Sequence, residues 1–156
     1  MLSVVGGPLT FQGMVSAVTA GGPLLIVEDD VDIREALQAY LELQGYEVRV
    51  AGDGREALAH LAGPQPPSLI LLDMGLPVLD GHRVLTARRT DPALSRVPVV
   101  ILSAETADMS PRDRAVYAAS QGVAAFLPKP VEPKRLLETL RRLLPGLAAP
   151  QADALL

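Results

Sequence analysis

Residues 69–73, LILLD, decide the fold of this chain. The first four are apolar with no polar residue between them, which is typical of a strand buried on both faces of a parallel sheet. The run ends at Asp73. Because functional groups of an open parallel sheet lie beyond the carboxyl ends of its strands, we expect Asp73 at the edge where such a sheet carries its chemistry.

On either side of this strand, short apolar runs alternate with segments of helical periodicity. Residues 33–41 carry an amphipathic stripe, Asp53 and Ser110 are placed to cap helix N-termini, and Pro133 suits a first helical turn. This alternation predicts a flavodoxin-like (βα)5 fold of class α/β, a doubly wound five-stranded parallel sheet in a single domain. The expected strands are 24–27, 47–50, 69–72, 97–102 and 123–127, and the helices between them include 54–62, 80–89 and 111–121.

The composition restricts the class of protein. A length of 156 residues suits one domain. With a net charge of −4, the chain lacks the broad basic field of a nucleic-acid binder, so we expect no nucleic-acid partner. The absence of cysteine excludes disulfides, a thiol nucleophile and cysteine-based metal sites, and it favours a reducing cytoplasm. The longest apolar runs are far shorter than the roughly 20 residues of a membrane helix, so no membrane span is expected.

The two ends of the chain differ from its middle. Residues 1–22 carry no charge and are rich in glycine, and residues 146–156 are rich in alanine. We therefore expect a flexible N-terminal extension and a flexible C-terminal tail. Residues 23–145 would then form the folded domain. No output domain is expected after it, which predicts a stand-alone protein.

Polar side chains follow four of the expected strands. They are Glu28, Asp29 and Asp30 after the first, Asp73 after the third, Ser103 after the fourth and Lys129 after the fifth. Carboxylates that converge on one edge repel each other, and a hard divalent cation such as Mg²⁺ relieves the repulsion. A lysine opposite that cation suits a phosphoryl group, which would contact both. Asp73 is therefore a candidate for an aspartyl-phosphate intermediate, whereas taken alone it would more often be a cap of the next helix or turn.

Four segments, LLIVEDDVDIRE, LILLDMGLPVLDG, VPVVILSA and AFLPKP, resemble in this order the motifs of the receiver domain of two-component response regulators, of the single-domain, chemotaxis-regulator-like type. The resemblance covers residues 23–145. It implies that Asp73 accepts a phosphoryl group from the phosphohistidine of a sensor histidine kinase or a histidine phosphotransfer protein. It also implies a Mg²⁺ site, in which Mn²⁺ can substitute, formed by Glu28, Asp29, Asp73 and the backbone carbonyl of Met74.

The resemblance assigns roles to further side chains. Ser103 and Lys129 would contact oxygens of the phosphoryl group, and Ser103 with Phe126 would form the switch that follows phosphorylation. The Lys129–Pro130 peptide bond would be cis. The protein would be a phosphoacceptor signalling switch that catalyses only its own phosphorylation and dephosphorylation, rather than a metabolic enzyme.

The output surface implied by the resemblance comprises the helix 111–121, the last strand and the last helix. Arg114 and Tyr117, with several alanines, would offer there a face for an unknown output protein or for a homodimer. The signal would then pass by contact between proteins.

Two departures from the family pattern bear on the switch. The segment that follows Ser103 is a few residues longer than usual, with the excess in Glu105–Ser110. Gly75, two residues after Asp73, and Glu105, two residues after Ser103, stand at positions that flank the phosphoryl group in the family and affect its lifetime. These residues suggest altered access of water to the phosphoryl group.

Two other classes of protein stay open. One is a receiver-like interaction module that is never phosphorylated. The other is a phosphohydrolase of the haloacid dehalogenase type, which needs a second aspartate two residues after the nucleophile, where this chain has Gly75. No role is assigned to His60 or His82, and both are expected to be solvated.

Overall fold

The computed structural model describes residues 22–76, 78–103 and 110–147. Its central strand is β3 (Leu69–Asp73), in which every residue is buried. The parallel sheet has the order β2-β1-β3-β4-β5, with β1 at Leu24–Val27, β2 at Val48–Ala51, β4 at Val99–Ser103 and β5 at Ala125–Pro128. The direction of winding reverses between β1 and β3, and this reversal opens the crevice in which such sheets bind ligands.

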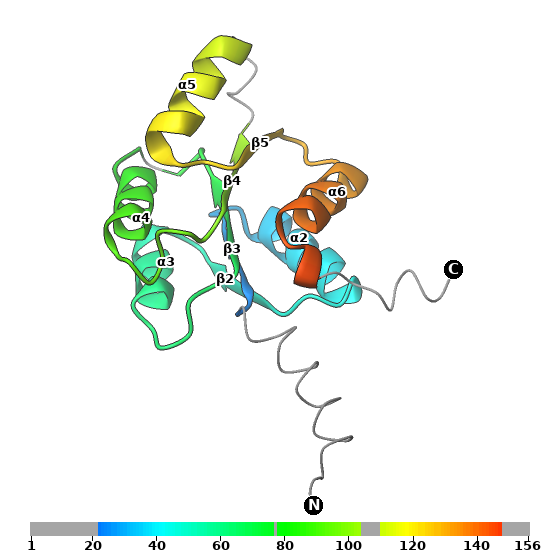
Figure 1. Ribbon diagram of the computed structural model, residues 1–156. Helices are drawn as coiled ribbons and strands as arrows, with labels where there is room; N and C mark the ends of the chain where they lie inside the picture. Colours follow the sequence, from blue (N-terminus) through cyan, green and yellow to red (C-terminus); the bar gives the residue numbers. More distant parts are fainter. Residues whose placement is uncertain (1–21, 77, 104–109, 148–156) are drawn as a thin grey trace, which may run out of the picture.

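Helices cover both faces of the sheet (Figure 1). One face carries α2 (Val31–Leu43) and α6 (Pro133–Leu143), and the other carries α3 (Gly54–Leu61), α4 (Val78–Thr90) and α5 (Pro111–Gln121). Residues of β3 alternate between the two cores: Leu69 and Leu71 face α2 and α6, while Ile70 and Leu72 face the other helices. The doubly wound (βα)5 fold predicted from the sequence is therefore confirmed.

Side chains at the N-termini explain where several helices begin. The carboxylate of Asp53 accepts a hydrogen bond from the amide of Glu56 at 2.8 Å, and the hydroxyl of Ser110 accepts one from the amide of Asp113 at 3.0 Å. Both caps were predicted from the sequence. Asp30 caps α2 in the same way, through the amide of Ile33 at 3.0 Å. Each cap satisfies an amide that the helix itself leaves unpaired.

Two predicted strands begin two residues later than expected, because backbone turns take the residues concerned; the other predicted strand boundaries lie within one residue of those observed. We expected a strand from Val97, but its amide donates to the carbonyl of Leu94 in a turn, and β4 begins at Val99. We also expected a strand from Val123, whose amide instead donates to the carbonyl of Ala118 at the end of α5. Gly122 makes this ending possible, since its φ of +70° is a conformation that favours glycine.

The extension predicted for residues 1–22 and the tail predicted for 146–156 lie outside the described residues, apart from Gly22 and residues 146–147. Residues 146 and 147 belong to the short helix η2 (Pro145–Leu147) that follows α6. Within the described ranges, no helix is both long enough and apolar enough to cross a membrane.

Gly54, the first residue of α3, lies against α4, and this contact gives a test of the packing. A Cβ atom at Gly54 would lie 2.6 Å from the Cβ and 3.1 Å from the Cα of Asp80. We expect Gly54→Ala to lower the free energy of unfolding in urea by about 2 kcal/mol, because the two helices must separate. Gly81→Ala is the matched control, since a Cβ there would contact nothing within 4 Å. An equal loss of stability in both variants would contradict the prediction.

Candidate functional site

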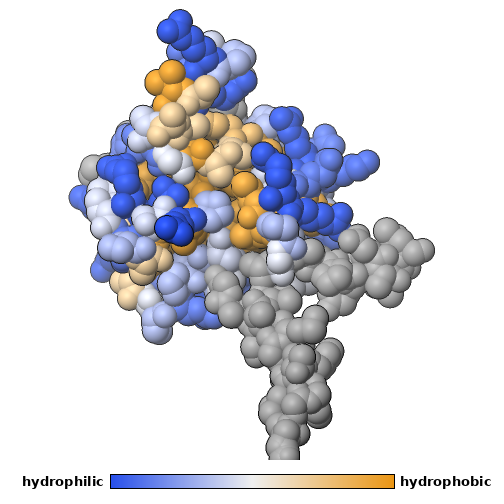
Figure 2. Space-filling view, viewed as in Figure 1, coloured by the Kyte–Doolittle hydropathy of each residue, from blue (hydrophilic) through white to orange (hydrophobic). Residues whose placement is uncertain are grey.

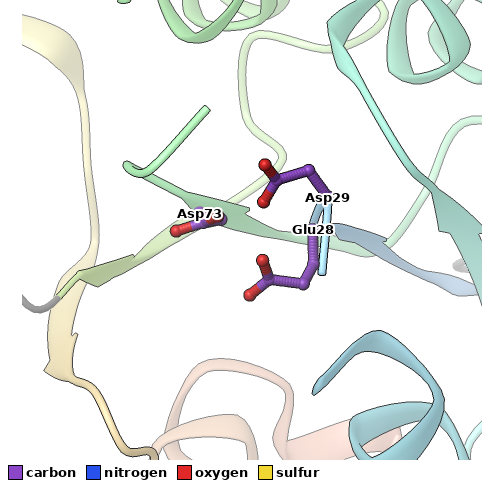
Figure 3. A group of neighbouring side chains, drawn as sticks. All are labelled: Glu28, Asp29 and Asp73. Carbon is purple, nitrogen blue, oxygen red and sulfur yellow. The ribbon is translucent and has the colours of Figure 1, made fainter. Parts of the chain in front are cut away.

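Three carboxylates meet where β1 and β3 end (Figure 3). Glu28 and Asp29 directly follow β1, and Asp73 is the last residue of β3. Val27 pairs with Leu72 in the parallel register, so the next residues of the two strands reach the same edge of the sheet. One oxygen from each carboxylate lies within 4.8 Å of the other two. Glu28 and Asp73 are buried, with exposed fractions of 0% and 2%, whereas Asp29 is exposed.

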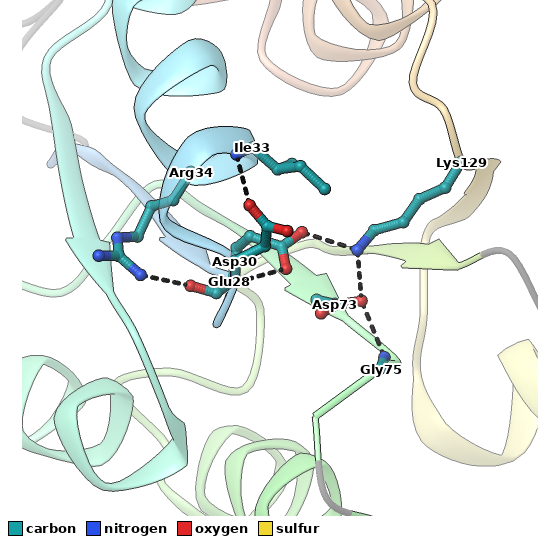
Figure 4. Close-up of polar contacts among 7 residues, drawn as sticks. All are labelled: Glu28, Asp30, Ile33, Arg34, Asp73, Gly75 and Lys129. Atoms are coloured by element: carbon teal, nitrogen blue, oxygen red, sulfur yellow. Dashed lines mark hydrogen bonds and ion pairs between the residues drawn. The ribbon is translucent and has the colours of Figure 1, made fainter.

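Lys129 extends from the end of β5 to both buried carboxylates (Figure 4). Its Nζ lies 2.8 Å from Oε1 of Glu28 and 2.9 Å from Oδ1 of Asp73. The backbone amide of Lys129 donates to the carbonyl of Ser103 at 3.3 Å, and the Lys129–Pro130 peptide bond is cis. One ammonium group thus joins β1, β3 and β5 at the same edge of the sheet.

The backbone after β3 holds the Asp73 carboxylate from a second side. The amide of Gly75 donates to Oδ1 of Asp73 at 2.8 Å. A Cβ atom at Gly75 would lie 3.1 Å from both carboxylate oxygens, so a larger residue would cover them. Met74 lies between Asp73 and Gly75, and its amide donates to the carbonyl of Leu102 at 2.9 Å. The tight turn orients the Asp73 carboxylate and, with glycine at position 75, places no side chain against it from this side.

Ser103 and Phe126 lie on β4 and β5, the two strands that follow β3 in the sheet. Ser103 ends β4 with an exposed fraction of 2%, one position beyond the residue that pairs with Asp73. Phe126 lies in β5 and is half-buried. Its ring packs against that of Tyr117, with centroids 6.0 Å apart and planes at 59°. The longer segment expected at Glu105–Ser110 lies outside the described residues, apart from Ser110.

The charges at this site are unequal, and the pKa values reflect this. Burial raises the pKa of Glu28 to about 7, although the hydrogen bond from Lys129 opposes the rise. Burial also acts to raise the pKa of Asp73, but hydrogen bonds from Glu28, Lys129 and Gly75 outweigh it and lower this pKa below its usual value. The two carboxylates raise the pKa of Lys129, against the effect of burial. Asp73 is therefore the carboxylate that ionises more easily, and Glu28 is the one that takes up a proton more easily.

One predicted member of the acidic group does not join it. The sequence placed Asp30 with Glu28 and Asp29, but the Asp30 side chain caps α2 and is exposed. The reason is the change from extended to helical backbone after Asp30, which favours a carboxylate that accepts from the first helical turn. Its amide donates to Oε2 of Glu28 at 3.2 Å, so Asp30 still helps to orient the buried glutamate.

Three other residues make contacts that were not predicted from the sequence. Arg34 had no assigned role, yet its Nη1 donates to the carbonyl of Glu28 at 2.9 Å. Tyr117 was expected on the outer face of its helix, but it is half-buried and packs on the core. His82 is exposed, as expected, whereas His60 is half-buried with Nε2 3.0 Å from the carbonyl oxygen of Val50. Only the position of Arg34 in the first helical turn after the acids could have indicated its contact.

Comparison with known proteins places these features in one family. The model of the response regulator receiver domain matches residues 24–141. Since the match covers most of the chain, the protein belongs to this family, the receiver domains of two-component signalling systems. Phosphorylation and Mg²⁺ binding are general features of the family.

Individual relatives agree with this assignment. The chain is 40% identical over 119 residues to the response regulator protein FleR of Pseudomonas aeruginosa, covering 76% of this chain and 24% of that protein. It is 36% identical over 127 residues to the transcriptional regulatory protein CpxR homolog of Haemophilus influenzae, covering 81% of this chain and 52% of that protein. The chain thus spans about half, or less, of the length of the curated relatives that it matches.

Solved structures give the same fold. The chemotaxis protein CheY4 of Vibrio cholerae superposes with a TM-score of 0.68 at 34% identity, covering 78% of this chain and 97% of that one. The receiver domain of a signal transduction histidine kinase from Syntrophus aciditrophicus superposes with a TM-score of 0.67 at 33% identity, covering 81% and 92%.

The raised pKa of Glu28 predicts how stability depends on pH when no divalent cation is present. As pH rises from 4.5 to about 7, the folded protein keeps a proton on Glu28 that the unfolded chain releases. Stability therefore falls over this window, by at most about 3 kcal/mol. Urea denaturation in EDTA near both ends of the window measures the fall. Glu28→Gln removes the titrating group and should flatten the dependence, and a fall of the same size in this variant would assign it to another group.

Proposed function

We propose that this protein is a phosphorylation-dependent signalling switch in which Asp73 is the phosphoacceptor. The supporting observation is the position of the Asp73 carboxylate at the end of the central strand, 2.9 Å from the ammonium of Lys129 and within 4.8 Å of the oxygens of Glu28 and Asp29. The phosphoryl donor is the phosphohistidine of a sensor histidine kinase or a histidine phosphotransfer protein, as in other two-component systems.

The state of Asp73 suits a nucleophile. A carboxylate with a lowered pKa is ionised at neutral pH, and Gly75 with Lys129 fixes its orientation. In the proposed step, an oxygen of Asp73 forms a bond to phosphorus while the bond from phosphorus to the donor imidazole breaks, and the imidazole nitrogen keeps the electron pair. Lys129 already contacts Asp73, so its ammonium can pair with a phosphoryl oxygen without crossing the site.

The acidic group also fits a divalent cation. Glu28, Asp29 and Asp73 supply hard oxygen donors, which Mg²⁺ prefers and Mn²⁺ also accepts, and the carbonyl of Met74 is the fourth donor in our proposal. Glu28 and Asp73 share the single ammonium group of Lys129, so the acidic group carries negative charge that Lys129 alone does not balance. A bound Mg²⁺ would neutralise phosphoryl oxygens during transfer. The exposed Asp29 is the donor that solvent reaches most easily.

We propose that Ser103 and Phe126 respond to phosphorylation of Asp73. Ser103 would contact a phosphoryl oxygen, and Phe126 would follow the change on the surface formed by α5, β5 and α6. This surface would bind an output protein, or a second copy of the chain. A protein partner suits the net charge of −4 better than a nucleic acid does. The domain limits 23–145, the stand-alone organisation and the cytoplasmic location stay predictions from the sequence.

Phosphorylation of Asp73 can be measured directly. Incubation with acetyl phosphate and Mg²⁺ should add about 80 Da to the intact mass, because one phosphoryl group is transferred. Asp73→Asn should abolish the adduct, and EDTA should abolish it in the wild type. Asp32→Asn, the same change at an exposed position of α2, is the matched control and should be labelled normally.

Other outcomes point to the alternative classes. A labelled Asp73→Asn protein would remove Asp73 from its role. No adduct in the wild type, with no response to beryllofluoride and Mg²⁺, would favour an interaction module that is not phosphorylated. Sustained turnover of p-nitrophenyl phosphate would favour a phosphohydrolase.

The metal site has a separate test in two neighbouring aspartates. Asp29→Asn removes a charge from the carboxylate group and should raise the Kd for Mg²⁺ by about tenfold, because charge count sets cation affinity. Asp30→Asn removes the same charge one residue away but leaves a side chain that can still cap α2, so its effect should be small. Isothermal titration with Mg²⁺ alone measures both variants. Equal weakening would show a general effect of charge rather than a ligand at Asp29.

A further inference from the structure

Helix α5 is attached to the domain by few side chains. None of its residues is buried, and Val116 on its outer side is 60% exposed. At its C-terminal end, Nη1 of Arg89 donates to Oε1 of Gln121 at 3.1 Å. Figure 2 shows hydrophobic surface beside α5, over β4 and β5. A helix held in this way can shift at low cost when one of its few inward contacts changes.

Tyr117 is the aromatic side chain through which the middle of α5 meets the core. Its ring packs on that of Phe126 in β5, with centroids 6.0 Å apart in a tilted arrangement favourable for aromatic pairs. Ala118 beside it also packs on this core, but only with a methyl group. The position of α5 relative to β5 therefore depends strongly on the Tyr117 ring.

The same Tyr117 side chain also lines the small cleft that contains Asp73. This cleft has a volume of about 30 Å³, and its other lining residues are Met74, Leu76, Gly81 and His82. A space of this size holds about one or two water molecules and is small for a phosphoryl group. A group added to Asp73 on this side would therefore come into contact with the residues that line the cleft.

We propose that Tyr117 is a positioning residue, whose ring passes the state of Asp73 to Phe126 and to α5. This inference rests on the proposed function, since it requires Asp73 to be phosphorylated. Among the described residues that line the cleft, Met74, Leu76, Gly81 and His82 belong to the β3–α4 segment or to α4, and Tyr117 belongs to α5. One rigid ring thus touches both the cleft of the acceptor and the aromatic residue of β5.

The neutral phenol suits this role. Burial raises the pKa of Tyr117, so its side chain carries no charge near neutral pH that would repel a phosphoryl group. Its response is therefore one of packing, which a phenylalanine can reproduce and an alanine cannot.

The chain contains two phenylalanines, Phe11 and Phe126, which makes Phe126 easy to observe. The full chain labelled with 4-fluorophenylalanine is followed by ¹⁹F NMR before and after acetyl phosphate and Mg²⁺, with intact mass giving the phosphorylated fraction. In the wild type, a second Phe126 resonance at a shifted frequency should grow in proportion to that fraction. In Tyr117→Ala, the shift should fall to less than half at the same phosphorylated fraction.

Three variants serve as controls. Tyr117→Phe keeps the ring and should keep the Phe126 shift, and its additional resonance reports on the substituted ring itself. Val116→Ala removes apolar surface from the exposed side of α5 and should also keep the shift. Tyr117→Leu replaces Tyr117→Ala if the latter fails to fold, and it should lose the shift because it lacks the ring.

Each other result has a defined meaning. A full Phe126 shift in a folded Tyr117→Ala or Tyr117→Leu protein would overturn the inference. So would a loss of the shift in Val116→Ala, or a wild-type resonance that does not move although the mass shows phosphorylation. Absence of the mass adduct in the wild type would instead overturn the proposed function, and the inference with it.

Discussion

The carboxylates of Glu28 and Asp73 are buried within reach of a single ammonium group, that of Lys129. The rest of the structure is arranged around this contact. A buried carboxylate without a partner is unstable, so the fold must bring Lys129 to residues that are far away in the sequence. The strand order does this. It places β1 beside β3, and the end of β5 two strands beyond β3 along the same edge.

A single ammonium group does not balance three carboxylates, and the imbalance defines the resting state of the site. Glu28, the fully buried acid, carries the raised pKa, whereas Asp73 is stabilised as an anion by Gly75 and Lys129. Asp29 is exposed and relieves its charge in solvent. The three acids therefore differ in state although they are close together, and burial and hydrogen bonding cause the difference. A site in this state favours any cation that can replace the proton.

The sequence predicted the features that depend on the ends of strands. Asp73, Ser103 and Lys129 each follow or end an apolar run, and parallel strands bring such positions to one edge whatever the details of packing. It could not predict features that depend on local competition or on three-dimensional contact. Asp30 is acidic like its neighbours in sequence, but its carboxylate accepts a hydrogen bond from the amide of Ile33 in the next helix.

Contacts between helices and strands were also beyond the sequence. The periodicity of α5 is weak because none of its residues is fully buried, so the direction of Tyr117 could not be read from it. Arg34 acts through a backbone carbonyl, which leaves no trace in the pattern of side chains. The strand boundaries at Val97 and Val123 failed for a related reason, since apolar residues occupy turns there as readily as strands.

The distribution of the site along the chain has a consequence for biosynthesis. Glu28 and Asp73 emerge from the ribosome well before Lys129, which follows β5. A nascent chain that has formed β1 and β3 thus holds its acids without their ammonium partner until β5 has joined the edge of the sheet. Chains that end before β5 therefore lack the ammonium group that both buried acids contact in the folded domain.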